Sequence, residues 1–295
     1  MLAGYIEEIW QYPVKSMAGV RIERALITEA GIPGDRCWAV IDAEAGQIRS
    51  AKRWPELLQL AAGLVEQPCS DSSGYGAQVP EALVRLPDGS SFKTRDAEAP
   101  ARLSNFLGKP ARLAALAPPS ERSHYQLAEA HKEADIRADL GLLPGESIPD
   151  FSASPAQLRQ QLATNATPPG TYFDAFPLHL ISTTSLAYLA DRGGVDAVVQ
   201  RFRANFLIQP VDAGAQMIEN GWVGRRLQIG SAIVSVNSRT TRCSMPARAQ
   251  PSHRLAADPD LTRALVEHCE RCLGINLLVE QAGRCAAGDE ILLLD

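Results

Sequence analysis

The sequence predicts a mainly β fold with some α structure, an α+β protein whose strands form barrel-like sheets. Three observations support this class. Short stretches of alternating apolar and polar residues recur along the chain, turn-forming residues separate them, and few segments carry the spacing and capping residues of helices. A proline-rich run between residues 117 and 170 divides the strands into an N-terminal and a C-terminal group.

The first third of the chain has mostly the pattern of strands. Residues 20–23 alternate, and residues 37–41 are apolar and run into a turn-like stretch. Pro87-Asp88-Gly89 has the composition of a hairpin turn between two short strands. We expect a helix around residues 98–107 to close this region.

The middle of the chain changes in composition. Residues 117–170 contain repeated prolines and a polar amphipathic stretch at 125–140. Such a composition is typical of a linker or an inserted segment. The expected division of the chain is therefore 1–115, 116–174 and 175–295.

The last third predicts a mixture of strands and two helices. Residues 176–181 form a buried strand, after which Ser182 caps a helix that runs to about Asp191 and ends at Gly193-Gly194. A second helix has Asp258 as its N-cap, Pro259 at its first position, and Gly274 past its end. The remaining expected strands are 227–237, 275–280 and 290–294.

Composition limits the classes of function. The chain has 295 residues, of which 45% are hydrophobic and 21% charged, so it can bury one large core or two modest ones. Its net charge of -5 argues against nucleic acid or an anionic membrane as the main partner. No apolar run is long enough for a membrane helix, and the N-terminus lacks the features of a signal peptide. We therefore expect a cytoplasmic protein, in which six sparse cysteines stay reduced.

Cys243 is the main candidate for chemistry. It follows the alternating strand at 232–237 and lies beside Arg242. A thiol at a strand end next to a guanidinium ionises more readily than a thiol in a core, and the thiolate is the form that binds metals or attacks. The alternative is a small buried hydrophobic residue, because free cysteine is among the most buried residue types.

The other cysteine and histidine patterns favour a structural role in packing over a catalytic or metal-binding role. Cys269 and Cys272 form a C-x-x-C, but the helical spacing from Leu261 and Leu265 puts both on one apolar face, and no second ligand pair has zinc-finger spacing. His179, in an apolar strand, is expected to be a core histidine. Neither a Rossmann nor a Walker glycine loop is present, which disfavours a dehydrogenase or an ATPase.

Five short motifs resemble those of one protein family and occur in the same order along the chain as in that family. They are Tyr12-Pro13-Val14-Lys15-Ser16, Gly31-Ile32-Pro33-Gly34-Asp35-Arg36-Cys37-Trp38, Arg203-Ala204-Asn205-Phe206, Trp222-Val223-Gly224-Arg225-Arg226-Leu227 and Thr241-Arg242-Cys243. The chain resembles the MOSC family, which contains the C-terminal domain of molybdenum cofactor sulfurase and the mitochondrial amidoxime-reducing component. The resemblance implies an N-terminal MOSC β-barrel-like lobe over 1–115 and a MOSC domain over 175–295, with the cofactor between them.

The resemblance implies a molybdenum cofactor, molybdopterin-bound molybdenum. An anionic cofactor with a phosphate group needs permanent cations and hydrogen-bond donors on one wall. For each basic residue of these motifs considered alone, a surface salt bridge is the alternative interpretation. The residues expected to bind the cofactor are Lys15, Ser16, Arg36, Thr183, Arg203, Asn205, Thr241 and Arg242.

The same resemblance implies that Cys243 is the catalytic residue and completes the coordination of molybdenum, since thiolates suit sulfur-loving metals. The expected reaction reduces N-hydroxylated small molecules, such as amidoximes or hydroxylamino purines. Electrons would come from a separate protein of the ferredoxin, flavin reductase or cytochrome b5 type, because no C-x4-C-x2-C cluster motif is present. The family also brings an association with pyridoxal phosphate.

Two alternatives stay open. The protein could carry the molybdenum cofactor, or a persulfide on Cys243, without reductase turnover, or it could be a non-catalytic interaction protein that retains the fold. The chain also departs from better-known family members after the cysteine, where Ser244-Met245-Pro246-Ala247-Arg248 replaces a hydrophobic residue and a polar pair. This difference leaves the substrate open.

Overall fold

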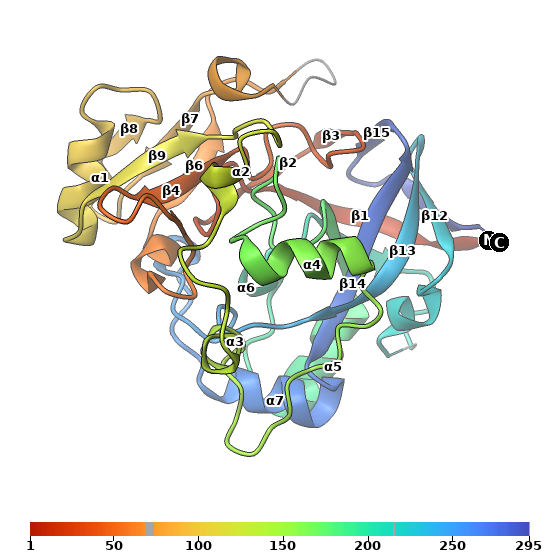
Figure 1. Cartoon of the computed structure of the whole chain (residues 1–295). Coiled ribbons are helices and arrows are strands. Elements are labelled where there is room, and N and C mark those ends of the chain that lie inside the picture. The colour runs from red at the N-terminus through yellow and green to blue at the C-terminus, as the bar shows by residue number, and fades with distance from the viewer. Residues whose placement is uncertain (69–73, 215, 295) are drawn as a thin grey trace.

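The centre of the molecule is a closed β-barrel (Figure 1). The computed structural model describes residues 1–68, 74–214 and 216–294. Within this part of the chain, seven strands follow the order β11-β10-β14-β13-β12-β16-β1, and pairing of β1 with β11 closes the ring. They are β1 (Leu2–Gln11), β10 (Leu178–Ser182), β11 (Phe206–Pro210), β12 (Arg226–Ile229), β13 (Ala232–Thr241), β14 (Cys272–Gln281) and β16 (Glu290–Leu293).

Alternation along the strands fills the barrel. In β13, Ala232, Val234 and Val236 are buried while the residues between them are partly exposed. Such a period of two sends every second side chain to the interior. These residues join side chains from the other barrel strands in one apolar core, which confirms the predicted α+β class with its barrel.

A second lobe holds most of the N-terminal third. It contains two three-stranded sheets, in the orders β5-β4-β9 and β6-β7-β8, together with helix α1. Their bounds are β4 (Trp38–Asp42), β5 (Ile48–Arg49), β6 (Ala61–Leu64), β7 (Ala82–Arg85), β8 (Ser91–Lys93), β9 (Ala111–Ala115) and α1 (Ala99–Leu107). The expected helix at 98–107 and the hairpin around Asp88 are both present.

The two ends of the chain meet in the barrel. Strand β1 pairs with β16 near the C-terminus, and the short strands β2 (Val20–Ile22) and β3 (Arg24–Ile27) pair with β1 and β15 (Gly283–Ala286). The N-terminal residues therefore contribute to a barrel built mainly from the last third. The boundaries 1–115 and 175–295 stay a prediction.

Helices α5 (Thr183–Gly193), α6 (Val199–Phe202) and α7 (Asp260–Cys269) contribute to a separate core with the outer side of the barrel. Ser182 caps α5 as predicted, because its Oγ accepts a hydrogen bond of 3.1 Å from Ser185 N. Gly194, in the left-handed conformation, ends this helix. The short 3-10 helices are η1 (Pro55–Gln59), η2 (Gly76–Gln78), η3 (Ile218–Trp222) and η4 (Pro251–His253).

Helix α7 differs from its prediction at both ends. It begins at Asp260 rather than at Pro259, and it ends at Cys269. Glu270 and Arg271 follow with φ values of +51° and +59°, so the chain turns sharply and Cys272 begins β14. The placement of both cysteines on one helical face was therefore wrong: Cys269 is buried on α7, whereas Cys272 is half-buried on a strand.

The segment at 116–174, predicted to be a linker or an insert, includes three helices. It contains α2 (Arg122–Tyr125), α3 (Glu133–Leu140) and α4 (Ala156–Thr164). In the view of Figure 1, α4 crosses in front of the barrel and α3 lies below it. Neither α3 nor α4 has a fully buried residue. In the described part of the chain, no helix combines the length and apolar character needed to span a membrane.

We expect Gly274 to be one of the least replaceable residues of the barrel. It has a φ of +77°, and a Cβ there would lie 2.5 Å from Leu180 O. Gly288 has a similar φ of +89° with nothing within 4 Å, so it is a matched control. Gly288→Ala should lower the free energy of unfolding by about 1–2 kcal/mol through backbone strain alone. Gly274→Ala should lower it by about 1–3 kcal/mol more, because the added methyl group overpacks the sheet.

Urea unfolding of the two variants and the parent checks this expectation. An equal loss of stability in both variants would contradict a steric clash between a Cβ at position 274 and Leu180 O.

Candidate functional site

A cavity of about 650 Å³ lies where the N-terminal lobe, the barrel and the segment 116–174 meet. It collects residues that are far apart in sequence. The predicted site residues that line it are Lys15, Ser16, Arg36, Arg203, Asn205, Thr241, Arg242 and Cys243. Thr183 is not brought to this lining; it is the first residue of α5, and its Oγ1 lies 3.0 Å from Gln209 Oε1.

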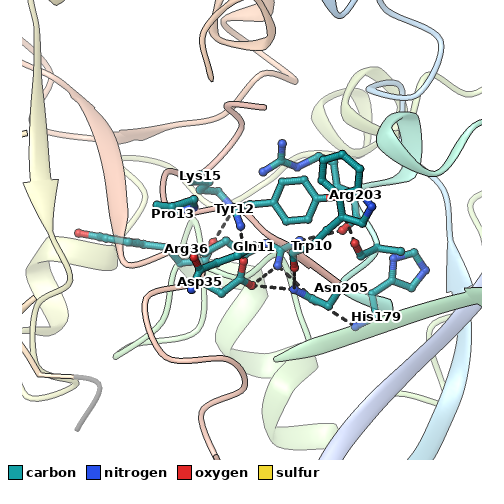
Figure 2. Close-up of polar contacts among 12 residues, drawn as sticks. Trp10, Gln11, Tyr12, Pro13, Lys15, Asp35, Arg36, His179, Arg203 and Asn205 are labelled. Carbon is teal, nitrogen blue, oxygen red and sulfur yellow. Dashed lines mark hydrogen bonds and ion pairs between the residues drawn. The ribbon is translucent and has the colours of Figure 1, made fainter. Parts of the chain in front are cut away.

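Asn205 is the centre of a buried hydrogen-bond network (Figure 2). Its Nδ2 donates to Trp10 O at 3.2 Å and to Asp35 Oδ2 at 3.1 Å. Its Oδ1 accepts from the His179 backbone N at 3.3 Å and from Arg36 Nη1 at 3.4 Å. Both donors and both lone pairs of the amide are therefore engaged by the protein, so Asn205 acts on a ligand through the residues it holds.

Two arginines share the ring of Tyr12. The guanidinium carbons of Arg36 and Arg203 lie 4.9 Å and 4.4 Å from its centroid, a distance at which cations are attracted to aromatic faces. Arg36 also pairs with the buried carboxylate of Asp35 and donates to Arg203 O at 3.0 Å. Burial and the neighbouring Arg36 lower the pKa of Arg203 to about 10, which leaves it charged at neutral pH.

Three of the lining residues have an unusual backbone. Ser16, Arg36 and Arg203 have φ values of +69°, +48° and +56°, in a region that residues other than glycine seldom adopt. Their surroundings impose it: the Ser16 Oγ accepts from Ala51 N at 2.9 Å, and Arg36 N donates to Tyr12 O at 2.7 Å. Strained positions of this kind gather at functional sites.

Lys15, Lys52 and Asp174 form a charged group on the cavity wall. Lys15 pairs with one oxygen of Asp174, and Lys52 lies 3.3 Å from the other. Burial lowers the pKa of Lys15 despite this partner. Burial opposes the charge on Lys52 too, but the negative charge of Asp174 outweighs it and raises the pKa of Lys52.

Sequence reasoning missed Lys52 and Asp174. Their only signs were a basic pair in a loop and a single acidic residue after the proline-rich run, patterns that are common on protein surfaces. What makes them part of the site is the folding of segments more than a hundred residues apart onto one cavity.

Arg242 and His179 meet beneath the strand end. Arg242 Nη2 donates to Phe202 O at 2.7 Å, and Nη1 lies 3.3 Å from His179 Nε2. The same Nε2 lies 3.4 Å from Leu273 O. A guanidinium only donates and a carbonyl oxygen only accepts, so a neutral ring satisfies one of these two contacts at a time, according to its tautomer. Burial and then Arg242 hold the pKa of His179 well below its usual range, so this buried histidine is neutral. Arg242 Nε is buried with no hydrogen-bond partner among the described residues.

Cys243 follows β13 by two residues and lines the cavity, half-buried. Its side chain packs against the core of the N-terminal lobe. The loop after it is held in place: Arg248 donates to Ala51 O at 2.5 Å and to Lys52 O at 3.0 Å. In the described part of the chain, no group of three or more His, Cys, Asp or Glu side chains forms a metal site.

The arrangement suits an anion beside a thiol. The cavity lining includes five cations, Lys15, Arg36, Lys52, Arg203 and Arg242, for which Asp35 and Asp174 are ion-pair and charge partners. The Nε–H of Arg242 is a buried donor without a partner among the described residues. A phosphate-bearing ligand supplies such acceptors in a geometry that arginine matches well.

Two family models match the chain. One, described as MOSC domain, matches residues 167–292, and the other, described as MOSC N-terminal beta barrel domain, matches residues 3–110. No curated protein matches the sequence.

Solved structures with likeness to the chain include three bacterial proteins. The YuaD protein from Bacillus subtilis is 14% identical, with 99% of this chain and 94% of that one covered and a TM-score of 0.46. YiiM from Geobacillus stearothermophilus is 22% identical, with 41% and 55% covered and a TM-score of 0.32. YiiM from Escherichia coli is 17% identical, with the same coverage and a TM-score of 0.30.

We expect Asp174→Asn to lower the free energy of unfolding by about 1–2 kcal/mol at pH 7, because Lys15 and Lys52 then lose their counter-charge. The loss is smaller than for a fully buried pair, since 52% of the Asp174 side chain is open to water in the cavity. The two lysines hold the pKa of Asp174 well below 3.8 against the effect of burial. Its contribution is thus present above the unfolded value of about 3.9 and is lost as pH falls toward the folded value.

Urea unfolding between pH 7 and pH 3 tests this. The difference between Asp174→Asn and the parent should shrink below about pH 4, whereas the exposed control Asp191→Asn should show little difference at any pH. A difference that stays constant with pH would disprove the ion-pair origin.

Proposed function

Because the chain belongs to the MOSC family, with both the N-terminal beta barrel domain and the MOSC domain, we propose that it binds the molybdenum cofactor and reduces N-hydroxylated small molecules. One observation carries the proposal. Cationic residues from remote segments line the same cavity as Cys243.

The residues present fit the cofactor. Lys15, Arg36, Arg203 and Arg242 would hold its phosphate end, since together they offer fixed cations and donors in one cavity. Ser16 and Thr241 line the same cavity and would add polar contacts. The proposed set leaves out Thr183, which is away from this lining, and treats Asn205 as a residue that positions Arg36.

Cys243 would supply the protein ligand to the metal. Its thiolate would be a soft ligand just after the end of strand β13, close to the positive charges of Arg242 and Lys52. When bound, the cofactor would supply the two-electron chemistry. Overall, R–NH–OH, two electrons and two protons would give R–NH₂ and water, with the N–O bond broken.

The partners of this reaction are also proposed. The electrons would come from a separate redox protein of the ferredoxin, flavin reductase or cytochrome b5 type. A cofactor or persulfide carrier would use the same cavity and the same thiol without turnover. The association with pyridoxal phosphate and the cytoplasmic location stay predictions.

We expect Cys243→Ala to reduce amidoxime turnover by more than about a hundredfold, because the metal loses the sulfur that sets its ligand field. The matched control is Cys269→Ala. Burial raises the pKa of the Cys269 thiol to about 11, so this cysteine is an unreactive packing group. Its variant should lose about 1 kcal/mol of stability and keep full turnover per folded molecule.

The proteins should be produced in a host that makes the cofactor. Metal analysis and turnover with an artificial electron donor then separate the alternatives. Stoichiometric molybdenum with turnover that depends on Cys243 supports the reductase, whereas molybdenum without any turnover indicates a carrier. A Cys243→Ala protein with parental turnover is incompatible with the proposed mechanism.

A further inference from the structure

Helices α3 and α4 present apolar side chains that no core covers. Ile136 and Leu140 are four residues apart on α3, and Leu158 and Leu162 are four apart on α4, so each pair lies on one helix face. All four are only partly buried and line the cavity. None belongs to the three cores formed by the described residues.

An amphipathic helix normally turns such a face toward a core. Here the two faces point to a cavity that also holds the thiol of Cys243. Two partly exposed leucines alone would be unremarkable, but four apolar side chains from two helices that line one concave surface together make a wall.

The charged groups of the same segment are engaged elsewhere. Asp139 Oδ1 lies 2.7 Å from Arg53 Nε, an ion pair without the geometry of a hydrogen bond. Asp150 accepts from the backbone and side chain of Ser152 at 2.8 Å and 2.7 Å, and Arg159 donates to Ser152 O at 2.9 Å. What this segment offers the cavity is therefore mainly its apolar surface.

A buried arginine fixes the wall to the barrel. Arg271 pairs with both carboxylate oxygens of Glu146 and donates to Leu140 O at 2.8 Å and to Gly141 O at 3.3 Å. Bidentate pairs of this kind give geometric specificity as well as energy. The C-terminal end of α3 is thus held at the start of β14, next to the strand end that leads to Cys243.

The peptide on each side of Cys243 is joined to this anchor. Arg271 Nη1 also donates to Arg242 O at 3.3 Å. On the other side, the Ser244 Oγ and N donate to Asp139 O at 3.1 Å and 3.3 Å. The wall and the thiol therefore keep a fixed position relative to each other.

We propose that the apolar faces of α3 and α4 form the substrate subsite and select N-hydroxylated compounds with an uncharged apolar body, such as an aryl group. This inference rests on the proposed function, which assigns the N–O group of the substrate to the Cys243 side. The cavity has two unlike walls: the cations favour the anionic cofactor, and the helices favour a carbon skeleton. The substrate body lies along Ile136 and Leu162 while its N–O end faces the thiol.

The test uses two probes that share the N–O group and differ in their body, benzamidoxime and acetamidoxime. Their dissociation constants are measured by calorimetry on molybdenum-loaded protein without an electron donor, so that no turnover occurs. The parent should bind the phenyl compound about tenfold more tightly, equivalent to about 1.4 kcal/mol. Leu162→Asn and, from the other helix, Ile136→Asn should each remove most of that preference and leave acetamidoxime binding unchanged.

Val211→Asn is the control, because this valine is 52% exposed and does not line the cavity; it should keep the preference. The proposal is overturned if the parent fails to prefer benzamidoxime, or if Leu162→Asn and Ile136→Asn both behave like the control. Molybdenum content is read on the same samples. Lack of the metal in the parent would refute the proposed function, whereas a loaded parent without the preference would refute only the subsite.

Discussion

The buried amide of Asn205 is the contact on which the rest of the site depends. It joins β1 through Trp10, β10 through His179, and the N-terminal lobe through Asp35 and Arg36. An amide with all its hydrogen bonds made inside a protein is costly to disturb, because each lost partner leaves a buried polar group. This network therefore fixes the distance between the lobe and the barrel, and with it the width of the cavity.

The same network supports a concentration of positive charge. Arginines and lysines repel one another when buried, and burial itself lowers the pKa of Lys15, Arg203 and Arg242. Asp35, Asp174 and the ring of Tyr12 reduce this repulsion only in part. The strained backbones of Arg36 and Arg203 are held by the fold in the same place. A site that combines buried positive charge with strained backbone in this way favours the binding of an anion.

The segment 116–174 gives the cavity its other wall and ties that wall to the thiol. Arg271 connects Glu146 to the peptide before Cys243, and Ser244 connects the peptide after it to Asp139. Residues 244–248, which follow Cys243, thus have a structural role: Ser244 fastens the loop to α3 and Arg248 fastens it to the loop of Lys52.

The sequence by itself determined much of the local structure and identified the candidate functional residues. Period-two alternation predicted the barrel strands, Ser182 and the pair Gly193-Gly194 marked the ends of α5, and the ordered motifs pointed to the basic residues and to Cys243. Only the tertiary structure decided that Lys52 and Asp174 line the cavity and that Thr183 does not. It also decided that the Asn205 amide makes all its hydrogen bonds to other protein groups. It also separated Cys269 from Cys272, because two left-handed residues end the helix where the spacing predicted continuation. The physical reason is the same in these cases. The periodicity of strands and helices is a local property of the sequence. Which side chains line one cavity, and which groups bind the Asn205 amide, depends on contacts between segments far apart in sequence.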